Sequence, residues 1–192
     1  MTDANIVDAA QIEELSANLR DSADRMKYTY KAHEKAADRY DLYEKWRHVA
    51  LIVFTVLSAS TLIVSIFALV GHEAWGNLAV AIVATCASLA SLLGDYLDFA
   101  GKSQRHQMAA VKTRALFVGY EDLIGDLRTG AVTPATARKR RDQMRAEENA
   151  VLADIARTTR KDYDRASKAI ETDEKTSEAQ DALHAASSGG AA

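Results

Sequence analysis

The chain has 192 residues, 48% of them hydrophobic, and a formal net charge of −3. A slightly negative chain has no general attraction to polyanions, so we expect no nucleic-acid partner. About forty residues fall in two long apolar runs, and the remainder is too short for a large separate globular domain. The one cysteine, Cys86, excludes an intramolecular disulfide and is interpreted as a packing residue.

Two uncharged apolar runs, residues 49–70 and 76–94, predict a two-pass membrane hairpin. A helix rises about 1.5 Å per residue, so the runs would span about 33 Å and about 28 Å, close to the roughly 30 Å of bilayer hydrocarbon. Lys and Arg occur just before the first run and just after the second, whereas the loop at 71–75 has neither. Because basic residues tend to stay on the cytoplasmic side, both termini are expected in the cytoplasm.

The second run is the less lipophilic of the two. It has seven Leu, Ile or Val residues, against fourteen Leu, Ile, Val or Phe residues in the first run. Its many small and hydroxylated residues permit close packing of the hairpin or line a polar cavity, and the sequence leaves both interpretations open. The candidate pore or packing stripe comprises Ala84, Ala87, Ser88, Ser91 and Asp95.

Two carboxylates, Asp95 and Asp98, lie three residues apart at the cytoplasmic end of the second run. One interpretation is that both are solvated interfacial side chains. The other is a candidate pore mouth, because an oligomer would multiply them into a ring of acid that favours cations.

The flanks are predicted to be cytoplasmic helices at about residues 25–48, 95–128 and 134–170. In the first two, side chains that can pack recur at intervals of three and four residues, so each helix presents one stripe. Because the two spans are antiparallel, these helices leave the membrane side by side and their stripes can pack together. The stripes comprise Met26, Tyr30, His33, Ala37 and Tyr40, and His106, Ala110, Thr113, Phe117, Tyr120, Ile124 and Leu127.

This antiparallel stalk is expected to end near residue 130. Gly130 suits a helix C-terminus, and Thr133 before Pro134 suits the start of the next helix. That third helix is expected to fold back along the stalk. The sequence therefore predicts an all-α membrane protein, in which a two-transmembrane helical hairpin extends into a cytoplasmic antiparallel helical stalk with a third, fold-back helix.

The chain divides into three regions: an amphipathic segment at 1–24 around Leu15 and Leu19, a two-transmembrane domain at 25–171, and a disordered tail at 172–192.

A basic cluster lies at the start of the third helix. It is either a solvated helix face or a docking surface for an acidic partner or a phosphate ligand. The cluster comprises Arg138, Lys139, Arg140, Arg141 and Arg145.

Three features together match a known pattern: the charged helix segment at 32–40 that ends in Tyr40, the aromatic-flanked spans, and Arg105-His106 just after the second span. Over about residues 25–165 the chain resembles the SLATT family, bacterial two-transmembrane effectors associated with SMODS nucleotidyltransferases and SLOG sensors. The resemblance implies a pore-forming or membrane-disrupting effector of antiviral abortive infection in the inner membrane. It also implies a trigger, either a nucleotide signal or a partner such as a separately encoded nucleotide-signal synthase or sensor.

Conduction is implied by the resemblance alone, and the residues leave other functions open. One hairpin cannot enclose a water path, so any pore must be a homo-oligomer in the bilayer. The alternatives are a holin-like or small channel of another lineage and a membrane-anchored coiled-coil adaptor. The sequence has no phosphate loop and no nucleophile motif, and its five histidines show no metal-binding spacing, so we expect no enzyme activity, cofactor or metal.

Overall fold

The structure is a computed structural model that describes residues 3–59, 61–69, 71 and 73–188, and these residues contain six helices and no strand. The helices are α1 (Asp3–Ala59), α2 (Thr61–Leu69), α3 (Glu73–Leu97), α4 (Phe99–Thr129), α5 (Pro134–Asp154) and α6 (Arg160–Ser188). The predicted all-α class is confirmed. Two compact units divide the chain: the bundle unit, residues 1–37 with 105–192, and the hairpin unit, residues 38–104.

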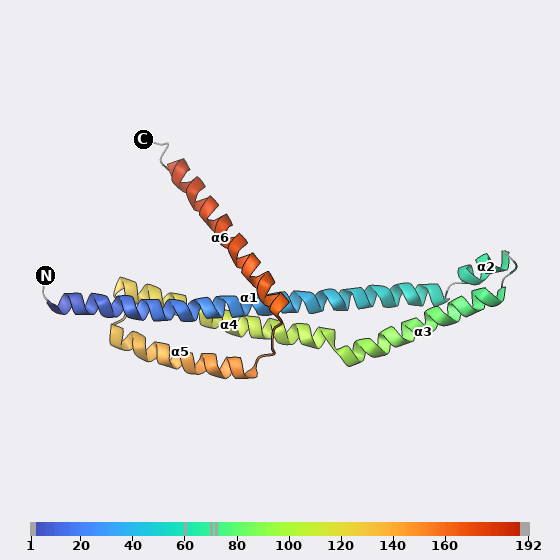
Figure 1. Cartoon of the computed structure of the whole chain (residues 1–192), viewed down its shortest axis with the longest axis horizontal. Helices are drawn as coiled ribbons and strands as arrows, with labels where there is room; N and C mark the ends of the chain where they lie inside the picture. The colour runs from blue at the N-terminus through green and yellow to red at the C-terminus, as the bar shows by residue number, and fades with distance from the viewer. Residues whose placement is uncertain (1–2, 60, 70, 72, 189–192) are drawn as a thin grey trace. The chain divides into compact units, whose positions relative to one another are not determined.

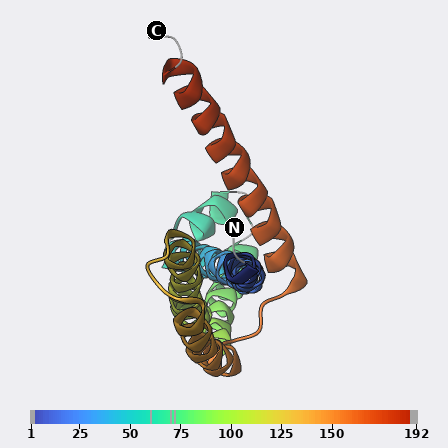
Figure 2. The ribbon, with the colours of Figure 1, turned by 90° about the vertical axis from the view of Figure 1, so that its left-hand side faces the viewer.

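In the bundle unit, α1, α4 and α5 lie side by side (Figures 1 and 2). Most residues of the predicted stripes are buried between α1 and α4, and Tyr30 and Phe117 are half-buried, because packing the two apolar faces together removes them from water. The core comprises Leu15, Leu19, Ala23 and Met26 of α1, Leu116, Tyr120, Leu123, Ile124 and Leu127 of α4, and Ala137 of α5.

The N-terminal amphipathic segment does not form a separate element. Helix α1 runs from Asp3 to Ala59 without a break, and Leu15 and Leu19 belong to the same core as Met26. Their spacing of four and seven residues keeps them on one helix face, so the stripe extends N-terminally from the predicted stalk helix.

The connection between α4 and α5 carries the predicted capping residues. Gly130 has a φ of +74°, and the N–H groups of Gly130 and Ala131 donate to the carbonyls of Leu127 and Asp126, which is a Schellman motif. Thr133 caps α5, with its hydroxyl accepting from the Thr136 N–H and Pro134 following. The reversal lets α5 return beside α1 and α4.

The prediction of one helix over 134–170 is wrong, because the chain breaks between α5 and α6. Thr159 caps α6: its hydroxyl and N–H donate to the Asp162 carboxylate, at 2.7 and 3.0 Å, and the Asp162 N–H approaches the hydroxyl at 3.4 Å. This is a capping box, written in the sequence as Thr-x-x-Asp. Helix α6 then continues to Ser188, past the predicted start of a disordered tail at 172.

A second break separates α3 from α4, where the sequence predicts one continuous helix. Asp98 has a φ of +45°, and its carboxylate accepts from the Gly101 N–H at 3.0 Å, so it caps α4. A Cβ at Gly101 would meet the Asp98 carboxylate, so a larger residue there would displace this capping side chain. The hydrogen bond from the Gly101 N–H to the Asp98 carboxylate thus favours a break between α3 and α4 over one continuous helix.

In the hairpin unit, α2 packs against α3 (Figure 1). A Cβ placed on Gly76 would lie 3.0 Å from the Cβ of Phe67 and 3.1 Å from the Cα of Val64. At Gly94, farther along α3, an added Cβ would collide with the Arg47 side chain of α1. The two buried glycines therefore allow close approach at both ends of the α3 packing face.

The described helices include one stretch, within Ala74–Thr129, long and apolar enough to cross a membrane, and only 6% of its most apolar window is buried. The first apolar run is divided between α1 and α2, with Ser60 and Val70 outside the described residues. Large apolar side chains of both runs are exposed, including Ile52 at 64%, Val56 at 62% and Leu92 at 68%. Such exposure is unfavourable in water and is typical of surfaces that contact a membrane or a protein partner.

We predict that Gly76→Val destabilises the helical hairpin. The added side chain meets the α2 backbone, which cannot move aside as a flexible side chain would, and overpacking of this kind typically costs about 1–3 kcal/mol. Thermal unfolding of the purified protein in detergent should show a lower midpoint. Ala81→Val, at an exposed position of the same helix, is the matched control and should leave the midpoint unchanged. Equal midpoints for the two variants would contradict the close contact.

Candidate functional site

Helix α3 carries two adjacent stripes with different environments. The first, at positions 76, 80, 83, 87, 90 and 94, packs within the hairpin unit and is buried or half-buried at every position. The second, one residue later at 77, 81, 84, 88, 91 and 95, is exposed except for a half-buried Ala84. One residue rotates the helix by about 100°, so the two stripes lie on neighbouring faces.

The candidate pore or packing stripe is split between these faces. Ala87 belongs to the packed stripe, whereas Ser88, Ser91 and Asp95 belong to the exposed one, together with Asn77. The Ser88 hydroxyl donates to the Ala84 carbonyl at 3.1 Å, which satisfies its donor within the helix. Packing of the hairpin therefore uses glycine, alanine and valine, and the polar residues of α3 remain on its surface.

The two candidate pore-mouth carboxylates have different surroundings. Asp98 caps α4 as described, whereas Asp95 is exposed at the end of α3. Arg47 lies beside Asp95 and donates to Glu44. The hydrogen bond to Glu44 raises the Arg47 pKa, the charge of Asp95 raises it further, and the same hydrogen bond lowers the Glu44 pKa. Asp95 thus has a cation near it within the hairpin unit, on α1.

The family-motif residue Tyr40 lies in an aromatic cluster of the hairpin unit. Its ring centroid is 6.3 Å from that of Tyr43 and 6.4 Å from that of Phe99, so α1 and the start of α4 meet there. Arg39 and Lys102 place their cations 4.8 and 6.0 Å from the same ring. Aromatic and basic side chains together are typical of the membrane–water boundary.

The other family-motif segments meet inside the bundle unit. His33 of α1 and His106 of α4 are both buried, and their Nδ1 atoms are 2.9 Å apart. Each segment alone gives no sign of this pair, because the two histidines are 73 positions apart and on different helices. Arg105, next to His106, is exposed. The described residues contain no group of three or more side chains that could hold a metal ion.

His33 is neutral at physiological pH. Burial lowers the His33 pKa to about 4, and the charge of His106 lowers it too, while Asp162 acts in the opposite direction. A hydrogen bond between two Nδ1 atoms needs one protonated and one bare nitrogen, and a neutral His33 ring can supply either one, depending on its tautomer. The hydrogen bond therefore joins α1 to α4 with the His33 ring uncharged.

The basic cluster does not form one uniform patch. Arg140 contacts Asp126 at 3.3 Å, Arg141 contacts Asp142 at 2.7 Å, and Arg138 donates to Gln11 at 3.3 Å. Lys139 is exposed, and Arg145 lies at the other end, near the Tyr120 hydroxyl. Acidic or polar neighbours thus occupy three of the five predicted docking residues.

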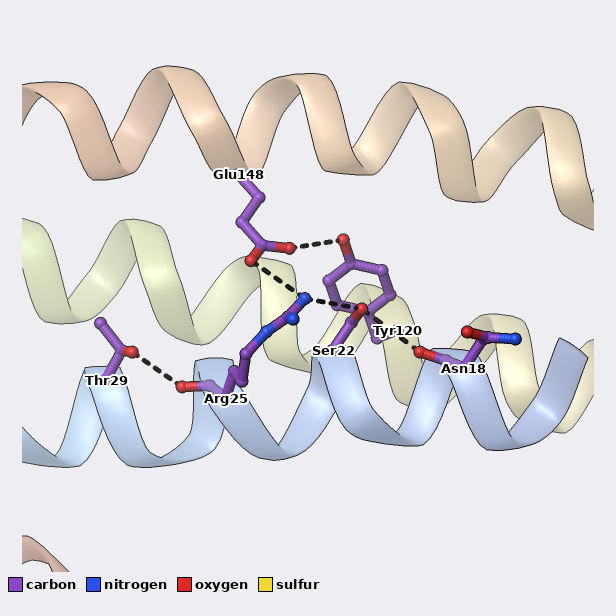
Figure 3. A network of polar contacts seen from close by, with 6 residues as sticks. All are labelled: Asn18, Ser22, Arg25, Thr29, Tyr120 and Glu148. Carbon is purple, nitrogen blue, oxygen red and sulfur yellow. Dashed lines mark hydrogen bonds and ion pairs between the residues drawn. The ribbon is translucent and has the colours of Figure 1, made fainter.

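A polar network missed from the sequence joins α5 to the other two helices (Figure 3). The buried Glu148 accepts from the Tyr120 hydroxyl at 2.9 Å and from Arg25 at 3.5 Å, and Arg25 also donates to Ser22. Burial and the bond to Glu148 raise the Tyr120 pKa, so the phenol stays protonated. The sequence does contain a signal for this network. Glu148 lies between Met144 and Val151 on the inward face of the helix, and a buried carboxylate needs a hydrogen-bond partner.

We predict that the buried His33 makes stability depend on pH. Its pKa is about 6.5 unfolded and about 4 folded, so the unfolded chain binds the proton more strongly between these values. The stabilisation is complete above pH 6.5 and falls by roughly 3 kcal/mol as the pH drops to 4. In detergent, the unfolding midpoint of the wild type should fall relative to that of His33→Leu as the pH drops from 7 to 4, because only the wild type loses this stabilisation. A difference that stays constant over this range would contradict the depressed pKa.

Comparison with known proteins places these features in one family. The model of the family described as SMODS and SLOG-associating 2TM effector domain family 4 matches residues 15–181. The match includes both apolar runs, the His33–His106 pair and the Glu148 network. No curated protein and no solved structure matches the chain significantly.

Proposed function

Because the chain belongs to the SMODS and SLOG-associating two-transmembrane effector family 4, a family of antiphage effectors, we propose that it acts as an oligomeric pore in the bacterial inner membrane. The observation that carries the proposal is the exposed polar stripe of α3. Asn77, Ser88, Ser91 and Asp95 share one face of a helix whose other exposed residues include Leu78, Leu89 and Leu92.

A polar stripe on a membrane helix is stable only beside another polar surface or water. The hairpin unit does not cover this stripe, since its packing uses the neighbouring face from Gly76 to Gly94. Further copies of the chain supply the missing environment. Stripes from several copies, turned toward a common axis, enclose a water path with Asp95 at one mouth, which a single hairpin cannot do.

The alternative of an adaptor without conduction predicts a different use of the stripe, namely dry packing against one partner helix. The exposed serines permit this too, because Ser88 already satisfies its donor within α3. The charge of Asp95 favours the pore, because a carboxylate at a dry helix interface is costly to desolvate. A nucleotide signal or a partner protein is the proposed trigger.

We predict that the loop between the spans is periplasmic and that both termini are cytoplasmic. In a Cys86→Ser background, a cysteine at the exposed Ala74 should react with a membrane-impermeant thiol reagent added outside intact cells. A cysteine at Gln104 should react only after the cells are opened. Gln104 is preferred to its neighbour Ser103, which is buried. Labelling of both sites from one side would exclude the two-pass topology.

We predict that the triggered or overexpressed protein depolarises cells and arrests growth, and that Asp95 sets ion preference. A ring of carboxylates attracts cations strongly where low-dielectric walls surround it. Asp95→Asn should therefore shift the reversal potential in bilayer recordings away from cation preference. Asp122→Asn, a matched loss of one exposed charge on α4, should not shift it.

Two outcomes would count against this proposal. If inserted, oligomeric protein with its trigger supplied leaves the membrane potential unchanged, the adaptor is the better interpretation. If Asp95→Asn changes assembly but leaves selectivity as it was, Asp95 acts through its neighbour Arg47 rather than on passing ions.

A further inference from the structure

The outer side of α4 carries apolar side chains that the bundle unit leaves uncovered. Met108, Val111 and Val118 are 54%, 64% and 45% exposed, and their spacing of three and seven residues places them on one helix face. We call these three side chains the ridge. An apolar row outside the two apolar runs is typical of a surface that contacts another protein.

An apolar groove of about 610 Å³ lies beside the ridge, between α4 and α5. Small side chains on both helices leave room in it for part of another helix. Lys112 at its edge contacts Asp154 at 3.2 Å, so this cation already has a partner. The apolar lining of the groove comprises Ala115, Leu116 and Gly119 of α4 and Met144, Ala150 and Val151 of α5.

We propose that the ridge of one copy of the chain packs into the groove of the next copy. The inference rests on the proposed oligomer and assigns a contact between its copies outside the two apolar runs. Docking of a helix in a groove uses apolar anchors that recur on one helix face, which the ridge supplies. The contact removes both apolar surfaces from water.

The membrane hairpin favours a second copy as the partner. Copies inserted by the same hairpin have the same orientation, so their α4 helices run parallel and lie at the same distance from the membrane. The ridge spans residues 108–118, and the α4 side of the groove spans 112–119. The two surfaces are therefore level with each other in neighbouring copies, as the contact requires.

The ridge and the groove face different sides of α4, so each copy can use both at once. Val111 and Leu116 are five residues apart, which turns the helix by about 140° at about 100° per residue. A contact between two different surfaces is heterologous, and repeated by rotation it closes a ring. A ring is the arrangement that a pore needs, whereas contact between two ridges would stop at a dimer.

The charges beside the two surfaces are complementary. Arg114 comes three residues after Val111 and four before Val118, so it lies beside the ridge, and it is exposed. Glu147 is exposed at the α5 edge of the groove. An ion pair between Arg114 of one copy and Glu147 of the next fixes the register of the contact more than it adds to affinity.

The contact is tested by disulfide crosslinking of the full-length protein in isolated membranes, in a Cys86→Ser background. Two differently tagged variants, Val111→Cys and Ala150→Cys, are co-expressed and oxidised with copper phenanthroline. We expect a product that carries both tags, at least fivefold more of it than when Asn149→Cys replaces Ala150→Cys. Asn149 is the matched control, because it is the adjacent exposed residue of α5 but shares a separate groove with Arg25 of α1.

Exchange of charges tests the register. Arg114→Glu and Glu147→Arg should each reduce the crosslinked fraction severalfold, and the double variant should restore it, because the pair then forms in the opposite sense. Lys139→Glu, a charge reversal at an exposed position of α5 outside the groove, should leave the fraction unchanged. The unfolding midpoint of each variant should match that of the Cys86→Ser protein, since all these positions are exposed.

Each result decides between outcomes. Equal crosslinking at Ala150→Cys and Asn149→Cys would overturn the groove contact. A stronger product of Val111→Cys with itself would replace it by a dimer of ridges, and a product only with a different protein would show that another partner covers the ridge. A double charge variant no better than the single ones would overturn the ion pair.

The crosslinking does not involve conduction, so the contact and the pore can fail separately. Copies that crosslink but never depolarise cells would refute the pore and leave the contact standing. Cells depolarised by a protein that shows no product between Val111→Cys and Ala150→Cys would refute the contact and leave the pore standing.

Discussion

Close packing of α1 against α4 is the interaction on which the bundle unit depends. Leu19 and Met26 of α1 and Tyr120 and Leu127 of α4 are each at most 1% exposed. Burial of a large apolar side chain stabilises by roughly 1.5–3 kcal/mol, so these contacts fix the two helices beside each other. The capped turn at Gly130 then returns α5 to this pair. Helix α6 follows through the Thr159 capping box and places Ala166 and Ile170 in buried positions.

Helix α5 shows what happens when apolar burial is scarce. Its buried residues are one alanine and one glutamate, and Met144 and Val151 are half-buried against the core. The Glu148 contacts with Tyr120 and Arg25 therefore add to a modest apolar contact. Polar contacts of this kind are directional and break together when one partner is withdrawn. The bundle thus combines a pair of helices with a large buried apolar face and a third helix with few buried residues.

In the hairpin unit, too, side chains match their surroundings, but the expected surroundings are lipid instead of water. Its leucines and valines are exposed because the expected surroundings are lipid, and the helices approach each other through glycine and alanine. With one face of α3 packed and another apolar, the polar stripe ending at Asp95 is left over. A single copy of the chain does not explain why these polar side chains are left exposed.

The sequence by itself determined the helical class, the two apolar runs, the stripes of α1 and α4, and the capping residues Gly130 and Thr133. These depend on local chemistry: helical periodicity, hydrophobic length and backbone preference act within a few residues. The breaks at Asp98 and Thr159 were also local. They were missed because helical spacing of apolar residues continues across each one, and a capping side chain competes with it.

Only the tertiary structure decided which side chains meet across helices. The pairing of His33 with His106 and of Glu148 with Tyr120 and Arg25 depends on the register of α1, α4 and α5, which periodicity leaves undefined. The division of the α3 small residues into a packed and an exposed stripe is of the same kind. A rotation of about 100°, the step from one residue to the next, separates them, and the contact of Gly76 with α2 fixes which stripe is covered.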